Sequence, residues 1–231
     1  MHPNSFWKKE LIETLKYKKT LVIKIILPLI LSIPLLIPGI PFDVKSNLFT
    51  LIIIFISTFG SAVGLIQLKE NKIIERLKVL PTSEYRLIFE YLFINSLMDC
   101  VKLGIPIAIL LVYNLGNLQI LPMFWVLLNF IISITFANAL GIIVAILAKT
   151  SGEGHLYSII MVLGISFLSG LFFISLPFSN LLYTFIPFHF LAISLIGFWK
   201  GILNLSFFPF IALILIFILI FVISPKLYRL E

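Results

Sequence analysis

The residues of this sequence that could do chemistry are few, and the most unusual are Asp99 and Lys102, which lie inside a long apolar stretch. On a helix, residues three positions apart share one face. Either charge alone inside a membrane costs about 2.5–3.5 kcal/mol on insertion scales, so we expect both to face protein or water, and each other. Two hypotheses remain open: the pair lines a substrate path or a dimer interface, or it is a self-neutralised structural pair.

Two asparagines in the next apolar stretch, Asn129 and Asn138, are further candidates for that path or interface. Polar residues of this kind more commonly join neighbouring helices in a membrane.

The residue patterns of the common enzyme classes are missing. The three histidines are far apart in the sequence, and there is no His-Glu-x-x-His pair, Gly-x-Ser-x-Gly elbow or Walker A loop. The single cysteine, Cys100, excludes an internal disulfide and a cysteine-based metal cluster. We therefore predict no catalytic residue, no metal site and no cofactor on this chain. If nucleotide drives the protein, another chain binds it.

The elements that must position these residues are membrane helices. The 231 residues are 61% apolar and 12% charged, against about 25% charged in soluble domains. Residues 48–68 and 205–223 contain no charge, and a helix needs about 20 such residues to cross a bilayer. The net charge of +7 fits a topology signal in a membrane protein better than nucleic-acid binding. We predict an all-α integral membrane protein that contacts lipid and binds no nucleic acid.

Two regions follow from this pattern. Residues 1–19 predict an amphipathic interfacial helix, because Trp7, Leu11 and Leu15 repeat every four residues among lysines; a basic flank that anchors topology is the alternative. Residues 20–231 predict a membrane domain of six spans. The spans are expected at about 21–41, 48–68, 87–113, 118–148, 156–178 and 205–223.

The lysines and arginines predict the orientation. With both termini in the cytoplasm, only Lys45 and Lys200 of the 17 basic residues fall outside, and Lys102 lies within a span. By the positive-inside rule this favours a multi-pass protein of the plasma (inner) membrane with both termini cytoplasmic.

The segment at about 179–203 is ambiguous. It is apolar enough for a seventh crossing, but Pro187 and His189 interrupt it, and a crossing would send Lys226 and Arg229 outside. We favour a re-entrant outer hairpin before the sixth span, whose backbone polar groups neighbouring protein must satisfy.

The loop between the second and third spans, KENKIIERLKVLPTSEYR (69–86), predicts a cytoplasmic helix at about 70–81 that ends at Pro81. Its apolar positions fall along one face, with charges largely on the others. Such a helix is suited to docking a soluble partner, or it is a membrane-surface connector. The residues concerned are Glu70, Ile73, Ile74, Glu75, Arg76, Leu77, Leu80 and Pro81.

This loop resembles the coupling segment of type-2 ATP-binding-cassette (ABC) transporter permeases. That segment shows an acidic residue, then Gly-Thr, then a glutamate, a leucine pair, a (Ser/Thr)-Pro dipeptide and a small polar residue; Glu75 and Pro81 correspond to its glutamate and proline. Lys72 and Ile73 replace the usual Gly-Thr, and Leu80 replaces the Ser/Thr. The size and the stretch LLYTFIPFHFLAISLIGFWKG look most like the short fluoroquinolone-type exporter permease subunits.

The resemblance implies the membrane-spanning subunit of an ABC transporter, an exporter of a small amphiphilic compound or drug. It would pair with a second permease copy or a paralogue, as a homodimer or heterodimer. It would bind separate ABC ATPase subunits, which carry ATP and Mg. Two alternatives are a non-transporting membrane scaffold or immunity subunit, and an ion-coupled secondary transporter that uses the Asp99/Lys102 pair.

Overall fold

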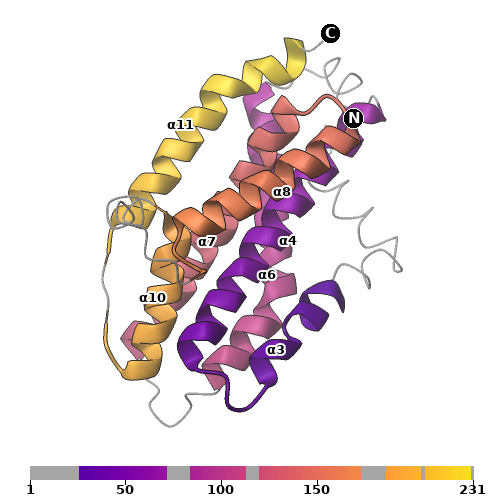
Figure 1. Ribbon diagram of the computed structural model, residues 1–231. Helices are drawn as coiled ribbons and strands as arrows, with labels where there is room; N and C mark the ends of the chain where they lie inside the picture. The colour runs from indigo at the N-terminus through magenta and orange to yellow at the C-terminus, as the bar shows by residue number, and fades with distance from the viewer. Residues whose placement is uncertain (1–25, 72–83, 113–119, 173–185, 204–205, 230–231) are drawn as a thin grey trace, which may run out of the picture.

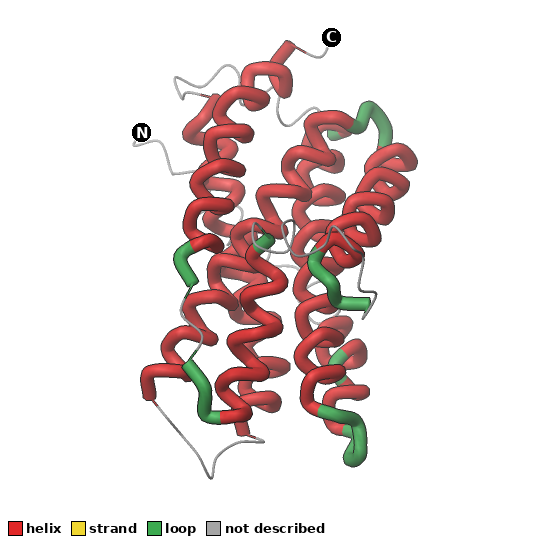
Figure 2. The backbone as a smooth tube through the Cα atoms, turned by 60° about the vertical axis from the view of Figure 1, so that its left-hand side comes forward, coloured by secondary structure: helices red, strands yellow, loops and turns green. Residues whose placement is uncertain are grey.

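The structure, a computed structural model, describes residues 26–71, 84–112, 120–172, 186–203 and 206–229. Within these ranges the regular secondary structure is helical (Figures 1 and 2). The helices are α3 (Ile33–Leu36), α4 (Phe42–Glu70), α6 (Glu84–Val112), α7 (Ile120–Leu147), α8 (Ser151–Leu168), α10 (Pro187–Lys200) and α11 (Phe208–Arg229).

Four of the described helices are long and apolar enough to cross a membrane: α4, α6 from Tyr85, α7 and α8. At about 1.5 Å per residue, the 29 residues of α4 and of α6 exceed the roughly 30 Å of a hydrocarbon core. The protein is therefore an α-helical, membrane-embedded protein, as its composition predicts.

Helix α7 lies at the centre of the bundle, with 78% of its most apolar window buried. Its main neighbour is α4, and the two helices run in the same direction. Phe49 stacks on Phe130 near their starts, and Lys69 reaches the carbonyl of Ala145 near their ends. Three successive spans of a chain that crosses back and forth have this arrangement, with α6 running the opposite way.

Close approach of α4 and α7 depends on a glycine. A Cβ at Gly141 would overlap the Ser61 side chain and the Thr58 carbonyl. Lipid is as apolar as the side chains, so such close packing, rather than exclusion of water, holds membrane helices together.

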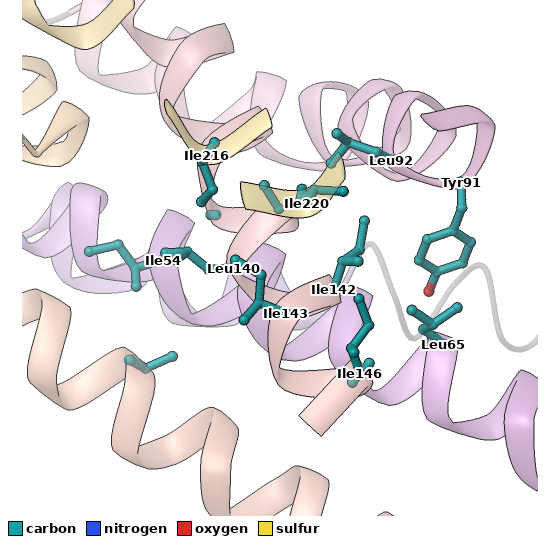
Figure 3. Packing of buried hydrophobic residues seen from close by; sticks show 14 of the residues in the cluster. Ile54, Leu65, Tyr91, Leu92, Leu140, Ile142, Ile143, Ile146, Ile216 and Ile220 are labelled. Carbon is teal, nitrogen blue, oxygen red and sulfur yellow. The ribbon is translucent and has the colours of Figure 1, made fainter. Parts of the chain in front are cut away.

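Two clusters of buried apolar side chains fill the bundle. The first joins α4, α6, α7, α8, α10 and α11, and Figure 3 labels several of its members, among them Ile54, Leu92, Ile142 and Ile220. The second joins α3, α4, α6, α7 and α10 around Phe49.

The first predicted span, at 21–41, is not confirmed as a crossing by its described residues. Residues 26–31 are helical, Ser32 is a turn, and α3 ends after four residues at Leu36. Pro34 has no N–H to donate within a helix, and Ile37 is extended (φ −67°, ψ 121°), as a residue before a proline prefers. Residues 21–25 lie outside the described part of the chain.

The remaining predicted spans are found with altered ends. Helix α4 starts six residues before 48, and α8 starts five residues before 156. The last predicted span corresponds to α11, whose described apolar part, Phe208–Val222, is shorter than the four long helices. Four of the six predicted spans are thus found among the described residues, and the first and the last are not confirmed.

The segment at about 179–203 contains one described helix, α10, and its residues 179–185 lie outside the described ranges. Helix α10 has 14 residues, packs against α4 and α7, and ends at Gly201 in the left-handed conformation (φ 69°). Near its start Phe190 stacks on Phe208 of α11. Helices α10 and α11 consequently lie one beyond the other along one side of the bundle (Figure 1).

The predicted coupling helix and interfacial helix fall largely outside the described residues. Glu70 is the last residue of α4 rather than part of a separate helix. Residues 72–83, with the coupling positions Ile73 to Pro81, and residues 1–25, with Trp7, Leu11 and Leu15, are not described.

Candidate functional site

The predicted pair of charges lies on α6, deep in the bundle. Lys102 Nζ donates to Asp99 Oδ1 at 2.6 Å, so the two side chains face each other as predicted. The Asp99 side chain is 4% exposed and that of Lys102 14%. A pair so deeply placed in a membrane protein is held by its mutual attraction and by further hydrogen bonds.

Those further hydrogen bonds come from two other helices. Asn138 Nδ2 on α7 donates to Asp99 Oδ2 at 3.0 Å. The backbone carbonyl of Asn138 accepts from Ser61 Oγ on α4 at 3.0 Å, and the Ser61 carbonyl accepts from Tyr91 Oη on α6 at 3.0 Å. We call Lys102, Asp99, Asn138, Ser61 and Tyr91 the polar network; it joins α4, α6 and α7.

Small residues allow this network to form. Gly141, one turn after Asn138, leaves room for Ser61, and a Cβ at Gly64 would overlap the Tyr91 hydroxyl. The ring of Tyr91 extends from α6 toward Leu65 of α4 in Figure 3. Gly141 and Gly64 therefore leave open the space that the Ser61 and Tyr91 side chains occupy, and a larger residue at either glycine would fill it.

Several buried oxygen atoms near the network have no hydrogen-bond partner among the described residues. They include Asn138 Oδ1, in the same amide that donates to Asp99, and Ser96 Oγ, one turn before Asp99 on α6. Ser57 Oγ and Thr58 Oγ1, one turn before Ser61 on α4, belong to the same set. Asn138 Oδ1 can only accept, whereas each of these hydroxyls can donate and accept, so this part of the bundle has unused hydrogen-bonding capacity.

Asn129 does not join the network. It is buried, but its Nδ2 donates to the carbonyl of Trp125, one turn earlier in its own helix. Nine residues of helix separate it from Asn138, about 13 Å along the axis. Of the four predicted path or interface residues, the structure thus brings together Asp99, Lys102 and Asn138.

Reasoning from the sequence missed Ser61 and Tyr91. A signal was present: Ser61 and Gly64 on one helix, and Asn138 and Gly141 on another, are small or polar residues spaced by about one turn, which is typical of close helix contacts in membranes. Tyr91 had no such signal, because its partner is a backbone carbonyl.

A second arrangement of charges lies where α4 ends. Lys69 Nζ donates to the carbonyls of Ala145 at 2.6 Å and Ala148 at 3.0 Å, at the C-terminal end of α7. Glu70 Oε1 accepts from the backbone N–H of Ser151 at 2.8 Å, at the first residue of α8. We call Lys69 and Glu70 the α4 end anchor. A cation at a helix C-terminus and an anion at an N-terminus each gain about 0.3–1 kcal/mol from the helix dipole.

The start of α8 is also capped within its own turn. Thr150 Oγ1 accepts from the N–H of Glu153 at 3.3 Å, and Glu153 Oε2 accepts from the N–H of Lys149 at 2.9 Å. The α7–α8 turn to which the anchor binds is consequently well defined.

A second ion pair, between Arg86 and Glu90, is peripheral. Arg86 Nε lies 2.8 Å from Glu90 Oε1, four residues later on the same helix face. The pair borders an open groove of about 360 Å³ that Phe89 and Phe93 also line.

The histidines of the described ranges lie apart: His155 stacks on Phe59, and His189 Nδ1 lies 3.3 Å from the Ser169 carbonyl. These ranges contain no group of three His, Cys, Asp or Glu that could hold a metal ion.

The arrangement as a whole is one buried ion pair held by three helices, and one charged anchor at the end of the bundle. Comparison of the chain with protein-family models, with curated proteins and with solved structures finds no significant match.

Proposed function

We propose that this chain is the permease subunit of an ABC transporter, which exports a small amphiphilic compound while a separate ATPase subunit hydrolyses ATP. The observation that carries the proposal is the α4 end anchor. The segment that resembles an ATPase-coupling element begins at Glu70, and Glu70 is bound to the first residue of α8 while Lys69 is bound to the end of α7. A force on this segment would therefore act on three helices together.

The other end of the same segment leads into α6, which begins at Glu84 and carries Asp99 and Lys102. A displacement of residues 72–83 by a partner would thus reach both sides of the polar network, through α4 and through α6. A transporter needs two conformations with different affinity for the substrate, and a network shared by three helices is suited to differ between them.

The test of the proposal is the partner. The tagged protein, purified from membranes of cells that also express the candidate ATPase subunits, should retain a chain with a Walker A motif. Reversing the charge at Glu75 or Arg76 (E75K, R76E) should reduce that retention, because the predicted docking surface then carries the wrong sign. The matched control is Lys149→Glu, an exposed charge on the α7–α8 turn. Equal retention by all variants would contradict the assignment of the coupling segment.

The anchor provides a separate test of coupling. Lys69→Met and Glu70→Gln remove its two charges and leave Glu75 and Arg76 in place. We expect the ATPase subunit to remain bound while substrate-stimulated ATP hydrolysis in proteoliposomes falls several-fold, because α4 is no longer tied to α7 and α8. Stimulation equal to that of the wild type would show that the anchor transmits nothing.

A second candidate function is ion-coupled secondary transport, which the buried Asp99–Lys102 pair favours. Intramembrane ionisable residues are common in proton and ion pathways. Uptake or efflux in proteoliposomes without any ATPase, abolished by an uncoupler, would support this candidate against the first.

A further inference from the structure

The groove beside the Arg86–Glu90 ion pair lies on the outer surface of α6. Arg86, Phe89, Glu90 and Phe93 line it, and it has a volume of about 360 Å³. Ligand pockets usually have about 300–1,000 Å³, so the groove suits one end of a larger molecule. Phe93 is 69% exposed, and Leu97, one turn further along α6, is 46% exposed. The apolar side of the groove therefore continues along the helix.

The place of the groove along α6 puts it at the membrane surface. The part of α6 that is apolar enough to cross, Tyr85–Val112, has 28 residues, or about 42 Å at about 1.5 Å per residue. A bilayer with its headgroups is about 40–45 Å thick, around a hydrocarbon core of about 30 Å. Arg86, one residue after the start of this span, therefore lies among the headgroups. Phe93, about 10 Å further along the axis, lies in the hydrocarbon.

The groove is at the same end of the bundle as the α4 end anchor. Tyr91 Oη of α6 donates to the Ser61 carbonyl of α4, which sets these two residues side by side. Helix α4 ends at Glu70, after Ser61, and α6 begins at Glu84, before Tyr91. The positive-inside rule predicts that this end is cytoplasmic.

The ion pair leaves hydrogen-bonding groups free on both of its members. Arg86 Nε donates to Glu90 Oε1 at 2.8 Å, and in the described part of the chain no other bond of the guanidinium is seen. Its two Nη groups carry further N–H donors. The Arg86 side chain is 63% exposed and that of Glu90 19%. The groove thus offers a cation with free donors beside an anion whose second oxygen, Oε2, can accept.

A cation and an anion side by side are complementary to a headgroup that carries both charges. A guanidinium binds phosphate through paired N–H donors, and a primary ammonium has three N–H donors for a carboxylate. Phosphatidylethanolamine brings both groups. The quaternary ammonium of phosphatidylcholine has no N–H to donate, and phosphatidylglycerol brings a phosphate without a cation for Glu90.

We propose that this groove binds one molecule of phosphatidylethanolamine. Its phosphate accepts from the Nη groups of Arg86, its ammonium donates to Glu90 Oε2, and one acyl chain lies along Phe89 and Phe93. The lipid comes from the surrounding membrane and its binding requires neither ATP nor a partner chain, so the site goes beyond the proposed function and does not depend on it.

Native mass spectrometry tests this on the full chain, delipidated and kept in dodecyl maltoside, with dioleoyl phosphatidylethanolamine, phosphatidylcholine or phosphatidylglycerol added. The wild type should bind phosphatidylethanolamine several-fold more tightly than either of the other lipids. Arg86→Gln should lose most of this binding, because the phosphate loses its charged donor. Lys149→Gln, which removes an exposed cation at the same end of the bundle, is the matched control and should bind like the wild type.

Glu90→Gln should reverse the preference, so that phosphatidylglycerol binds several-fold more tightly than phosphatidylethanolamine. In this variant Arg86 is an unpaired cation that attracts an anionic headgroup, and the ammonium has lost its carboxylate. Misfolding cannot produce a gain in affinity for one lipid, so this variant separates loss of the site from loss of the fold.

Equal binding of the three lipids by the wild type would overturn the proposal. Tighter binding of phosphatidylglycerol by the wild type would do so too, because it would identify a plain anion site at Arg86. An unchanged preference in Glu90→Gln would show that the carboxylate does not select the headgroup. The ABC proposal is unaffected by these results, since retention of the ATPase subunit tests it separately.

Discussion

At the scale of residues, the feature that sets this protein apart is a full charge pair inside an apolar bundle. Asp99 and Lys102 neutralise each other, and Asn138 and Ser61 extend their hydrogen bonds to two further helices. Buried pairs of this kind contribute little net stability compared with apolar residues, but breaking one member leaves an uncompensated charge. The pair is therefore expected to be sensitive to single substitutions and tolerant of a matched double one.

A double-mutant cycle tests this. Asp99→Asn and Lys102→Met alone should each lower the free energy of unfolding by about 3 kcal/mol, the low end of the range because Lys102 keeps some exposure. The double variant should lose clearly less than the sum of the two. Unfolding of the protein in mixed micelles by increasing SDS measures all four proteins; additive losses would show that the two charges do not interact.

At the scale of elements, close packing of α4 against α7 decides the shape of the bundle. Gly141 allows it, since a Cβ there would overlap both a side chain and a backbone carbonyl of α4. By contrast, Gly104 on α6 has no atom within 4 Å of the position that a Cβ would take. The two glycines look alike in the sequence, yet only one of them is at a helix contact.

Alanine at these two glycines should change stability in opposite directions. Gly141→Ala should destabilise the protein by about 1–3 kcal/mol, as overpacking does. Gly104→Ala should stabilise it by about 0.5–1 kcal/mol, because alanine favours the helix. Thermal unfolding in one detergent compares them; destabilisation by both would mean that α6 contacts another surface at Gly104.

The observed helix ends also show how accurately periodicity and composition predict where a helix begins and ends. The predicted third and fourth spans, 87–113 and 118–148, match α6 and α7 within three residues. Helix α4 begins earlier than predicted because Asp43 and Lys45 interrupt the apolar run without interrupting the helix; Lys45 is buried in its first turns. Hydropathy locates the part of a helix that suits lipid, whereas a helix can continue beyond it.

At the scale of the whole molecule, the two ends of the bundle differ. The α4 end anchor and the α7–α8 turn lie at one end. At the other end Phe42, at the start of α4, stacks on Trp199, at the end of α10. Helix α10 starts inside the bundle, where Ser133 Oγ of α7 donates to the Pro187 carbonyl at 3.4 Å, so it does not cross the full thickness by itself.

Labelling of single cysteines in a Cys100→Ser background tests this arrangement. Cysteines at Gly39 and Lys200 should react with an impermeant maleimide from the same side of the membrane, and cysteines at Asn71 and Thr150 from the opposite side. The positive-inside rule predicts that Asn71 and Thr150 are cytoplasmic. If the cysteine that replaces Lys200 reacted from the same side as the cysteine that replaces Asn71, the re-entrant placement of α10 would be contradicted.

The sequence by itself determined the class of the protein, most of the long helices and the pairing of Asp99 with Lys102. These follow from local rules: about 20 apolar residues span a bilayer, and residues three apart on a helix meet. The first predicted span, at 21–41, is not confirmed: its described helix is interrupted at Ser32 and ends at Leu36, because composition counts apolar residues and not the N–H groups that a helix needs.

Only the tertiary structure decided that Asn138 contacts Asp99 while Asn129 does not. It also decided that Ser61 and Tyr91 complete the polar network. The same holds for Lys69 and Glu70, which bind the end of α7 and the start of α8. The physical reason is that these contacts join residues 30 to 81 positions apart. They depend on which faces of the helices pack together and how closely, and in a membrane that is set by small residues such as Gly141 rather than by the apolar pattern that all of these helices share.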